Sequence, residues 1–211
     1  MLSNLHWPDS TVAILASGSS LSEEQCETVR KWRLVDPVGR RRVIAINTTF
    51  LRAPWADILY ACDFPWWEHY GRQVASGKWQ HFGQQLWTQD VNAARIIGMH
   101  YVRSAPAPGL GRTPGLIHQG GNGAYQAVNL AYQAGARRIV LLGCDMRGTK
   151  WHGEHPAPLT NPKDYLFAAW IRNFKALAMD LASEGVTVIN ASPGSALPWF
   201  QSTNDLAQAL Q

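Results

Sequence analysis

"HQGGNGAYQAVNLAYQAGARRIVLLGCDM", residues 118–146, joins a glycine cluster, a helical pattern and a strand pattern, and it decides the fold class. Residues 124–134 are good helix formers with apolar side chains at helical spacing. Gly135 predicts the end of this helix, because glycine takes the left-handed conformation without steric cost. Residues 137–143 are a short apolar run, typical of a parallel strand buried on both faces. The stretch therefore predicts half of a βαβ unit.

The alternation of strands and helices continues along the rest of the chain. Ser22 and Gln25 have the spacing of a capping box at the start of one helix. Alternating elements with apolar strands predict a single α/β domain over residues 1–211. We expect a Rossmann-like, mostly parallel sheet of about six or seven strands, with helices on both faces. Strands are expected within residues 11–20, 41–50, 56–63, 84–89, 94–104, 137–143 and 186–197, and helices within 21–34, 65–77, 124–134 and 165–185.

The composition argues against several classes of protein. A chain of 211 residues that is 46% hydrophobic can form one substantial core. No run approaches the ~20 apolar residues of a membrane span, and the first ten residues lack the pattern of a signal peptide. The three cysteines lie far apart in the sequence, which favours a cytoplasmic localisation. The net charge of +4 comes from small scattered clusters, which favour solvated element ends over a nucleic-acid track.

One segment has no periodic pattern. Residues 105–115, "APAPGLGRTPG", are rich in proline and glycine. They predict a flexible loop or lid, which we place at residues 104–117.

Small and polar residues follow the predicted strands. The carboxyl ends of parallel strands meet at one edge of a sheet, where ligands bind. Any one of these residues is explained by a turn or a helix cap, but their convergence on one edge predicts a polar site. The residues are Gly18, Ser19, Ser20, Asn47, Thr48, Asp63, Asp145 and Ser192.

Two glycine-containing turns at this edge predict an anion site. The turn "SGSS" at 17–20 and the turn "QGGNG" at 119–123 each precede a predicted helix. Backbone N–H groups and the helix dipole at such a turn favour a phosphate. Gly121 and Gly123 would let the backbone approach a phosphate or ribose, with Asn122 as the hydrogen-bonding side chain. The alternative is a tight turn with a helix cap and no ligand.

The polar loop after Asp145 contains "KWHGEHP", with His152 and His155 three residues apart. Histidine exchanges a proton near neutral pH, so either ring is a candidate general base or phosphate contact. A metal site is the alternative, although no third His or Cys lies at ligand spacing nearby. A loop stabilised by histidine hydrogen bonds is also open. We favour His155, because Pro156 biases its backbone towards an extended form.

The order of these motifs resembles the bacterial lipooligosaccharide sialyltransferase family and related domains of flagellin-glycosylation and phage proteins. The resemblance rests on "GSSLS", "AINTTF", "GGNGAYQAVNLAYQAGARRIVLLGCDM", the histidine-bearing loop and "VINASPGSAL". It implies a Rossmann-type domain that binds a nucleotide sugar, with cytidine as the base, and transfers the glycosyl group to an acceptor hydroxyl through a histidine base. By the same likeness, the donor contacts are Gly18, Ser19, Ser20, Asn47, Gly121, Asn122 and Gly123, and the base or ribose contacts are Ser192, Gly194 and Ser195.

Two other functions stay open. The chain is also similar to archaeal 6-hydroxymethylpterin pyrophosphokinases, which implies transfer from ATP with Mg²⁺. Asp63 and Asp145 would then hold the metal, with Asp145 essential for catalysis. A phage-type protein that binds a nucleotide without chemistry is the third possibility. For glycosyl transfer we expect no required cofactor; the acceptor is unknown, and a homo-oligomer is open.

Overall fold

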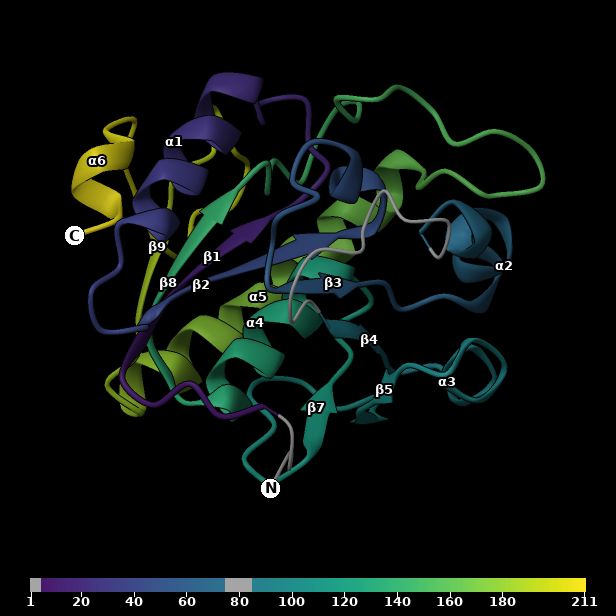
Figure 1. The fold of residues 1–211 in the computed structure, drawn as a ribbon, viewed down its shortest axis with the longest axis horizontal. Helices are drawn as coiled ribbons and strands as arrows, with labels where there is room; N and C mark the ends of the chain where they lie inside the picture. The colour runs from purple at the N-terminus through teal and green to yellow at the C-terminus, as the bar shows by residue number, and fades with distance from the viewer. Residues whose placement is uncertain (1–4, 75–84) are drawn as a thin grey trace.

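The computed structural model describes residues 5–74 and 85–211, and they form the expected α/β architecture around a mostly parallel sheet (Figure 1). The sheet has eight strands in the order β10-β9-β8-β1-β2-β3-β4-β5, and a second sheet pairs β6 with β7. All neighbouring strands in both sheets run parallel. In chain order the elements are β1 (Ser10–Leu15), α1 (Glu23–Leu34), β2 (Arg41–Ile46), the 3₁₀ helix η1 (Asn47–Leu51), β3 (Ile58–Tyr60), α2 (Phe64–Gln73), β4 (Gln85–Thr88), α3 (Val91–Ile97), β5 (His100–Tyr101), β6 (Arg103–Ala105), β7 (Leu116–His118), α4 (Gly123–Ala134), β8 (Ala136–Leu142), α5 (Asp164–Ser183), β9 (Thr187–Asn190), β10 (Gln201–Ser202) and α6 (Leu206–Ala209).

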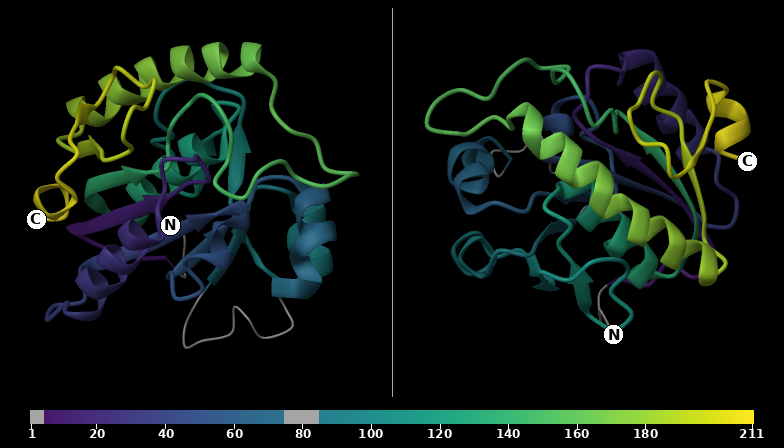
Figure 2. Two further views of the ribbon diagram at one scale, coloured as in Figure 1. Left: turned by 90° about the horizontal axis from the view of Figure 1, so that it is seen from above. Right: turned by 180° about the vertical axis from the view of Figure 1, so that it is seen from behind.

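The main sheet is buried on both faces, which explains the apolar strands. Successive residues of β1 point to opposite sides. Val12 and Ile14 join a core with α4 and α5, whereas Ala13 and Leu15 join a core with α1, α2, α3 and α6. Figure 2 shows α4 and α5 together on one side of the sheet. The prediction of helices on both faces is therefore confirmed.

The strand order places a topological switch point between β1 and β8. From β1 the chain moves outwards through β2, β3, β4 and β5, then returns through α4 to place β8 on the other side of β1. In open parallel sheets, ligands bind outside the carboxyl ends of the strands where the order reverses. The loops after β1 and β8 therefore bound the expected site.

Local predictions differ from the structure in a few places. The strand predicted within 94–104 was wrong in its first half: residues 91–97 form α3, capped by Asp90 and ended by Gly98 in the left-handed conformation. The sheet has eight strands because β5 and β10, of two residues each, extend its edges. The predicted end of the 65–77 helix lies outside the described residues. The capping box of Ser22 and Gln25 is present in both directions. In the described part of the chain, no helix is both long and apolar enough for a bilayer.

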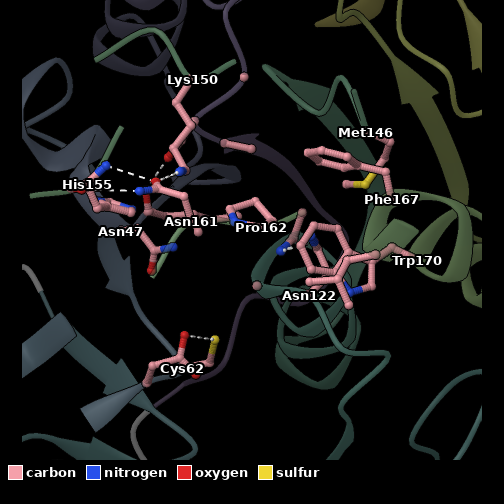
Figure 3. Close-up of a pocket in the computed structure, with 18 of the residues that line it drawn as sticks. Asn47, Cys62, Asn122, Met146, Lys150, His155, Asn161, Pro162, Phe167 and Trp170 are labelled. Carbon is pink, nitrogen blue, oxygen red and sulfur yellow. Dashed lines mark hydrogen bonds between the residues drawn. The ribbon is translucent and has the colours of Figure 1, made fainter. Parts of the chain in front are cut away.

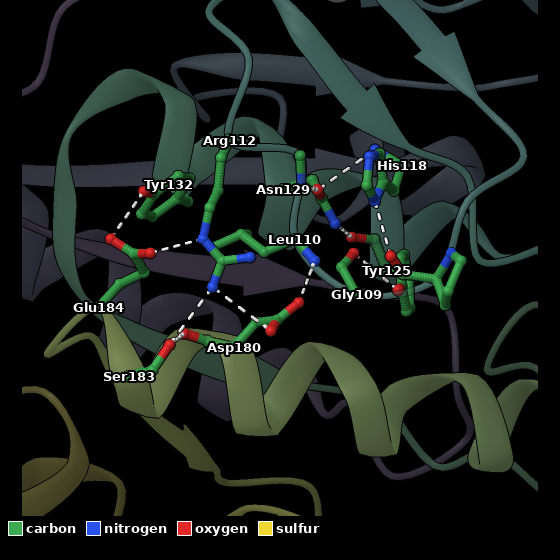
Figure 4. Close-up of polar contacts among 12 residues, drawn as sticks. Gly109, Leu110, Arg112, His118, Tyr125, Asn129, Tyr132, Asp180, Ser183 and Glu184 are labelled. Carbon is green, nitrogen blue, oxygen red and sulfur yellow. Dashed lines mark hydrogen bonds and ion pairs between the residues drawn. The ribbon is translucent and has the colours of Figure 1, made fainter.

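The proline- and glycine-rich segment 105–115 is anchored at several points (Figure 4). The N–H of Leu110 donates to Asp180 Oδ2 at 2.8 Å, and the N–H of Gly111 donates to Asn129 Oδ1 at 2.8 Å. Arg112 forms ion pairs with Asp180 on α5 and with Glu184, the residue that caps the end of α5. These contacts hold residues 110–112 against α4 and α5, while the flexible lid over 104–117 stays a prediction.

Asn129 allows a test of this anchoring. Its fully buried Oδ1 also accepts the N–H of His118 at 3.2 Å. We predict that Asn129→Ala lowers the free energy of unfolding by about 1–3 kcal/mol, because it leaves the buried N–H of Gly111 and the partly buried N–H of His118 without this acceptor. Urea denaturation measures this change. Asn92→Ala, at an exposed position of α3, should stay within about 0.5 kcal/mol of wild type. Equal stability of Asn129→Ala and Asn92→Ala would show that the segment is not held by Asn129.

Candidate functional site

A cleft of about 710 Å³ lies at the carboxyl edge of the main sheet (Figure 3). Its wall comes from the segments after β1, β2, β3, β4, β7 and β8 and from the first turns of α5. Ligand pockets of small molecules and cofactors have volumes of this order. The switch point therefore carries a cavity of the right size for a nucleotide.

The cleft gathers about half of the residues that the sequence analysis selected. Those in its wall are Gly18, Asn47, Asp63, Gly121, Asn122, Gly123, Asp145 and His155. Those outside its wall are Ser19, Ser20, Thr48, His152, Ser192, Gly194 and Ser195.

Asp145 joins the loops after β1 and β8. Its carboxylate accepts the N–H of Ser20 at 3.0 Å and the hydroxyls of both Ser19 and Ser20. Gly18 leaves no room for a side chain beside this carboxylate, because a Cβ at this position would be 2.4 Å from Asp145 Cγ and 2.5 Å from Gly143 O. A carboxylate therefore already occupies the N–H and hydroxyl donors of the turn where a phosphate was expected.

The loop after β8, residues 144–163, continues along the β1 turn. The N–H of Ser19 donates to Thr149 O at 3.1 Å, and the N–H of Trp151 donates to Ser17 O at 3.0 Å. The guanidinium of Arg52 lies 4.1 Å from the centre of the Trp151 ring. The loop that carries both histidines is thus held to the sheet by backbone pairing and by a cation–π contact.

The glycine turn before α4 has a structural explanation as well as a binding one. Asn122 caps α4 by accepting the N–H of Ala124 at 2.8 Å and that of Tyr125 at 3.4 Å. Gly120 and Gly121 both have positive φ, and a Cβ on Gly120 would lie 2.2 Å from the Tyr125 ring. The side-chain oxygen of Asn122 is therefore used by the helix cap. The side-chain –NH₂ group remains available to a ligand in the cleft.

Four of the residues outside the wall support the framework instead. Ser192 Oγ accepts the N–H of Cys144 at 2.8 Å, and Ser195 Oγ donates to Cys144 O at 2.7 Å. Gly194 lies under the guanidinium of Arg147. Thr48 Oγ1 accepts from Trp66 Nε1 at 3.4 Å. These contacts brace the loops after β9, β8 and β2.

The two histidines form a pair with their ring centres 4.8 Å apart. His155 lines the cleft, whereas His152 does not. Burial, followed by the positive charge of Lys150, lowers the pKa of each imidazole to about 4. Nε2 of His152 and Nδ1 of His155 are buried without a hydrogen-bond partner among the described residues. The cleft therefore contains a neutral imidazole that is able to accept a proton.

Asn47 and Met146, both in the wall, have φ values of +50° and +52°. Non-glycine residues in this region gather at ligand sites. Oδ1 of Asn47 is buried without a partner in the described part of the chain. The end of β2 thus offers an acceptor that the protein itself leaves unused.

The sequence analysis missed several residues of the wall. Phe167 and Trp170 lie one turn apart on α5, with ring centres 5.3 Å apart, and they line the cleft together with Met146 (Figure 3). Their i, i+3 spacing on a helix beside the site was the available signal. Lys150 and Asn161 also line the cleft. Lys150 belongs to the KWHGEHP segment, of which only the histidines were selected, and Asn161 lies outside every motif named above.

Three glutamines form a neutral part of the wall: Gln89, Gln119 and Gln126. Nε2 of Gln119 donates to Gln89 Oε1 at 3.0 Å, and Nε2 of Gln126 donates to Gln119 O at 3.1 Å. Tyr60 fixes Gln126 by donating to its Oε1 at 2.6 Å. Uncharged, oriented amides of this kind suit hydroxyl groups.

Asp63 and Asp145, the residues of the alternative Mg²⁺ site, both already make hydrogen bonds within the protein. Asp145 is already bonded to the β1 turn, and Asp63 Oδ2 accepts the thiol of Cys62 at 3.4 Å. Across residues 5–74 and 85–211, no three His, Cys, Asp or Glu side chains are grouped as a metal site would need.

Comparisons with protein-family models, curated proteins and solved structures found no match to this chain.

The histidine pair predicts a particular pH dependence of stability. An unfolded imidazole titrates near 6.5, whereas each folded one titrates near 4. Between these values the unfolded chain binds more protons, so the free energy of unfolding falls as the pH falls through this window. We predict that the double variant His152→Gln/His155→Gln loses less stability than wild type between pH 6.5 and pH 4. Urea midpoints measure the difference.

The exposed His6 provides the control for this experiment. His6→Gln should follow the wild-type curve. If the double variant loses as much stability as wild type across the window, the two rings are not held in their neutral form by the fold.

Proposed function

We propose that the cleft binds a nucleotide sugar and that His155 is the base for inverting transfer of the glycosyl group to an acceptor hydroxyl. The observation that carries the proposal is a neutral imidazole in the wall of a nucleotide-sized cleft at the β1/β8 switch point. The unused acceptor of Asn47 and the glutamine wall supply partners for sugar and ribose hydroxyls.

The base of the nucleotide would stack at the aromatic end of the cleft. Phe167, Trp170 and Met146 provide flat and polarisable surface there. The amide –NH₂ of Asn122 lies in the same wall as a donor to a carbonyl or ring nitrogen. Cytidine is the base that the family resemblance implies.

The reaction needs one proton acceptor and a stabilised leaving group. His155 would take the proton of the acceptor hydroxyl while its oxygen forms a bond to the anomeric carbon. The bond from that carbon to the phosphate oxygen breaks, and the phosphate keeps the electron pair. Its charge would face the basic residues of the loop after β8 and the N-terminus of α4, both of which favour an anion.

A binding measurement tests the ligand class. We predict that at least one of CMP, CDP, UDP, GDP, ADP and ATP binds, and that Trp170→Ala weakens this binding about 5- to 150-fold, because stacking on an aromatic ring contributes about 1–3 kcal/mol per base. Calorimetry with and without Mg²⁺ measures both. Trp199→Ala removes an equal ring outside the wall and should bind as wild type. Absence of binding by every nucleotide would refute the proposal.

Turnover tests the assignment of the base. In a panel of nucleotide sugars with mixed acceptors, we predict that His155→Gln slows release of the nucleotide about 10²- to 10⁴-fold without loss of nucleotide affinity. His6→Gln, which removes an exposed histidine that precedes β1, should keep wild-type turnover.

The other outcomes identify the alternatives. If nucleotides bind but no combination of nucleotide sugar and acceptor releases free nucleotide, the protein binds nucleotides without catalysis. Transfer from ATP that needs Mg²⁺ and Asp145 but neither His155 nor His152 would favour the pyrophosphokinase-like function.

A further inference from the structure

Lys150, Asn161 and His155 form a closed hydrogen-bonded unit at one end of the cleft (Figure 3). Nζ of Lys150 donates to Asn161 Oδ1 at 2.5 Å. The same oxygen accepts the N–H of His155 at 2.9 Å, and Asn161 Nδ2 donates to His155 O at 3.2 Å. One asparagine side chain thus fixes both backbone polar groups of His155 and the ammonium group of Lys150.

Within residues 5–74 and 85–211, the ammonium group of Lys150 forms no ion pair with a carboxylate. Burial lowers the pKa of Lys150, and the negative charge of Glu154 acts in the opposite direction. A partly buried cation without a counter-ion favours the binding of an anion. Lys150 itself lines the cleft.

Besides burial, Lys150, His152 and His69 are the groups whose positive charge acts on the His155 ring and lowers its pKa. On its own loop, His152 lies 4.8 Å away between ring centres, and Lys150 and Glu154 are close in sequence. On α2, His69 adds a further repulsive contribution, and the Tyr70 ring lies 6.2 Å away. Lys150 is the side chain that lowers the proton affinity of His155 most. Its neutralisation would therefore change His155 directly.

We propose that Lys150 binds a phosphate group of the donor and that Asn161 couples this event to His155, so that the anionic substrate itself prepares the base. Lys150 is then a binding residue and Asn161 a positioning residue. The inference rests on the proposed function and adds to it that the donor must carry a phosphate at this end of the cleft.

Phosphate binding would act on His155 in two steps. A bound phosphate pairs with Lys150 and offsets its charge at His155, so the pKa of the imidazole rises from about 4 towards its ordinary range. A base whose pKa approaches the operating pH is more effective. Asn161 holds the backbone of His155 beside Lys150 before and after the phosphate binds. The distance between the bound phosphate and the imidazole therefore stays fixed.

Inorganic pyrophosphate serves as the probe, and the imidazole C–H resonance of His155 serves as the readout. In wild type, we expect pyrophosphate to raise the midpoint of the His155 titration by at least about one pH unit. Lys150→Met should weaken pyrophosphate binding at least about tenfold and raise the His155 midpoint in the free protein. Lys150→Arg, which keeps the charge, should restore binding. Lys163→Met, an exposed lysine outside the cleft wall, should behave as wild type.

The Asn161→Ala variant distinguishes the binding of pyrophosphate from its effect on the pKa of His155. Pyrophosphate affinity should stay within about threefold of wild type, because Lys150 remains, while the upward movement of the His155 midpoint should shrink. With a nucleotide-sugar substrate, the same variant should lower kcat more than it raises KM.

The inference is overturned if pyrophosphate leaves the wild-type His155 midpoint near 4, or if Lys150→Met binds pyrophosphate as wild type does. No transfer reaction is needed for this readout. If nucleotide binding and glycosyl transfer occur but do not depend on Lys150, the inference about Lys150 is wrong and the proposed function stands. If pyrophosphate raises the His155 midpoint but no glycosyl transfer is found, the proposed reaction is wrong and the inference about Lys150 stands.

Discussion

The contact between Asp145 and the turn after β1 organises the carboxyl edge of the sheet. β1 and β8 are neighbours only because the chain returns to the centre of the sheet after β5. Their loops must then share one small space, and the carboxylate of Asp145 fills it by accepting the N–H of Ser20 and two hydroxyls. Gly18 is required there, since any side chain would collide with Asp145 and Gly143. With this contact in place, the loop 144–163 pairs with the β1 turn and brings His155 to the cleft.

The same contact changes how an anion can be bound at this edge. In nucleotide-binding folds, the turn after the first strand commonly offers its N–H groups to phosphates. Here Asp145 takes Ser20 N–H, so a second carboxylate-sized anion at the same donors would be repelled by it. Positive charge is instead available on the loop after β8, where Lys150 and Arg147 line the cleft. This distribution of charge favours an anion near the histidine and uncharged groups beside the three glutamines.

The fold was largely predictable from the sequence because its signals are local. The pattern from 118 to 146 specifies a helix with an asparagine cap, a glycine stop and a buried strand, and α4 and β8 match it. The strand predicted within 94–104 failed because a seven-residue helix is too short to show a clear period, and Gly98 was interpreted as part of a strand rather than as the helix stop. Edge strands of two residues carry almost no pattern at all.

The site was predictable only in part, because its chemistry depends on distance in space. The rule that strand ends converge was enough to find Asn47, Asp63, Asp145 and the 121–123 turn in one wall. It could not tell that Asp145 would be bonded to Ser20 rather than exposed to a ligand. Nor could it find Asn161, whose link to Lys150 and His155 exists only in the folded loop.

The central claim is that a nucleotide occupies the cleft at the β1/β8 switch point, and amide chemical-shift mapping with CDP and UDP tests it most directly. The account predicts that the largest changes fall on the backbone amides of Asn122, Lys150 and His155 and on the indole of Trp170. Changes confined to the smaller pocket beside Cys26 and Arg52, or no changes with either nucleotide, would contradict it.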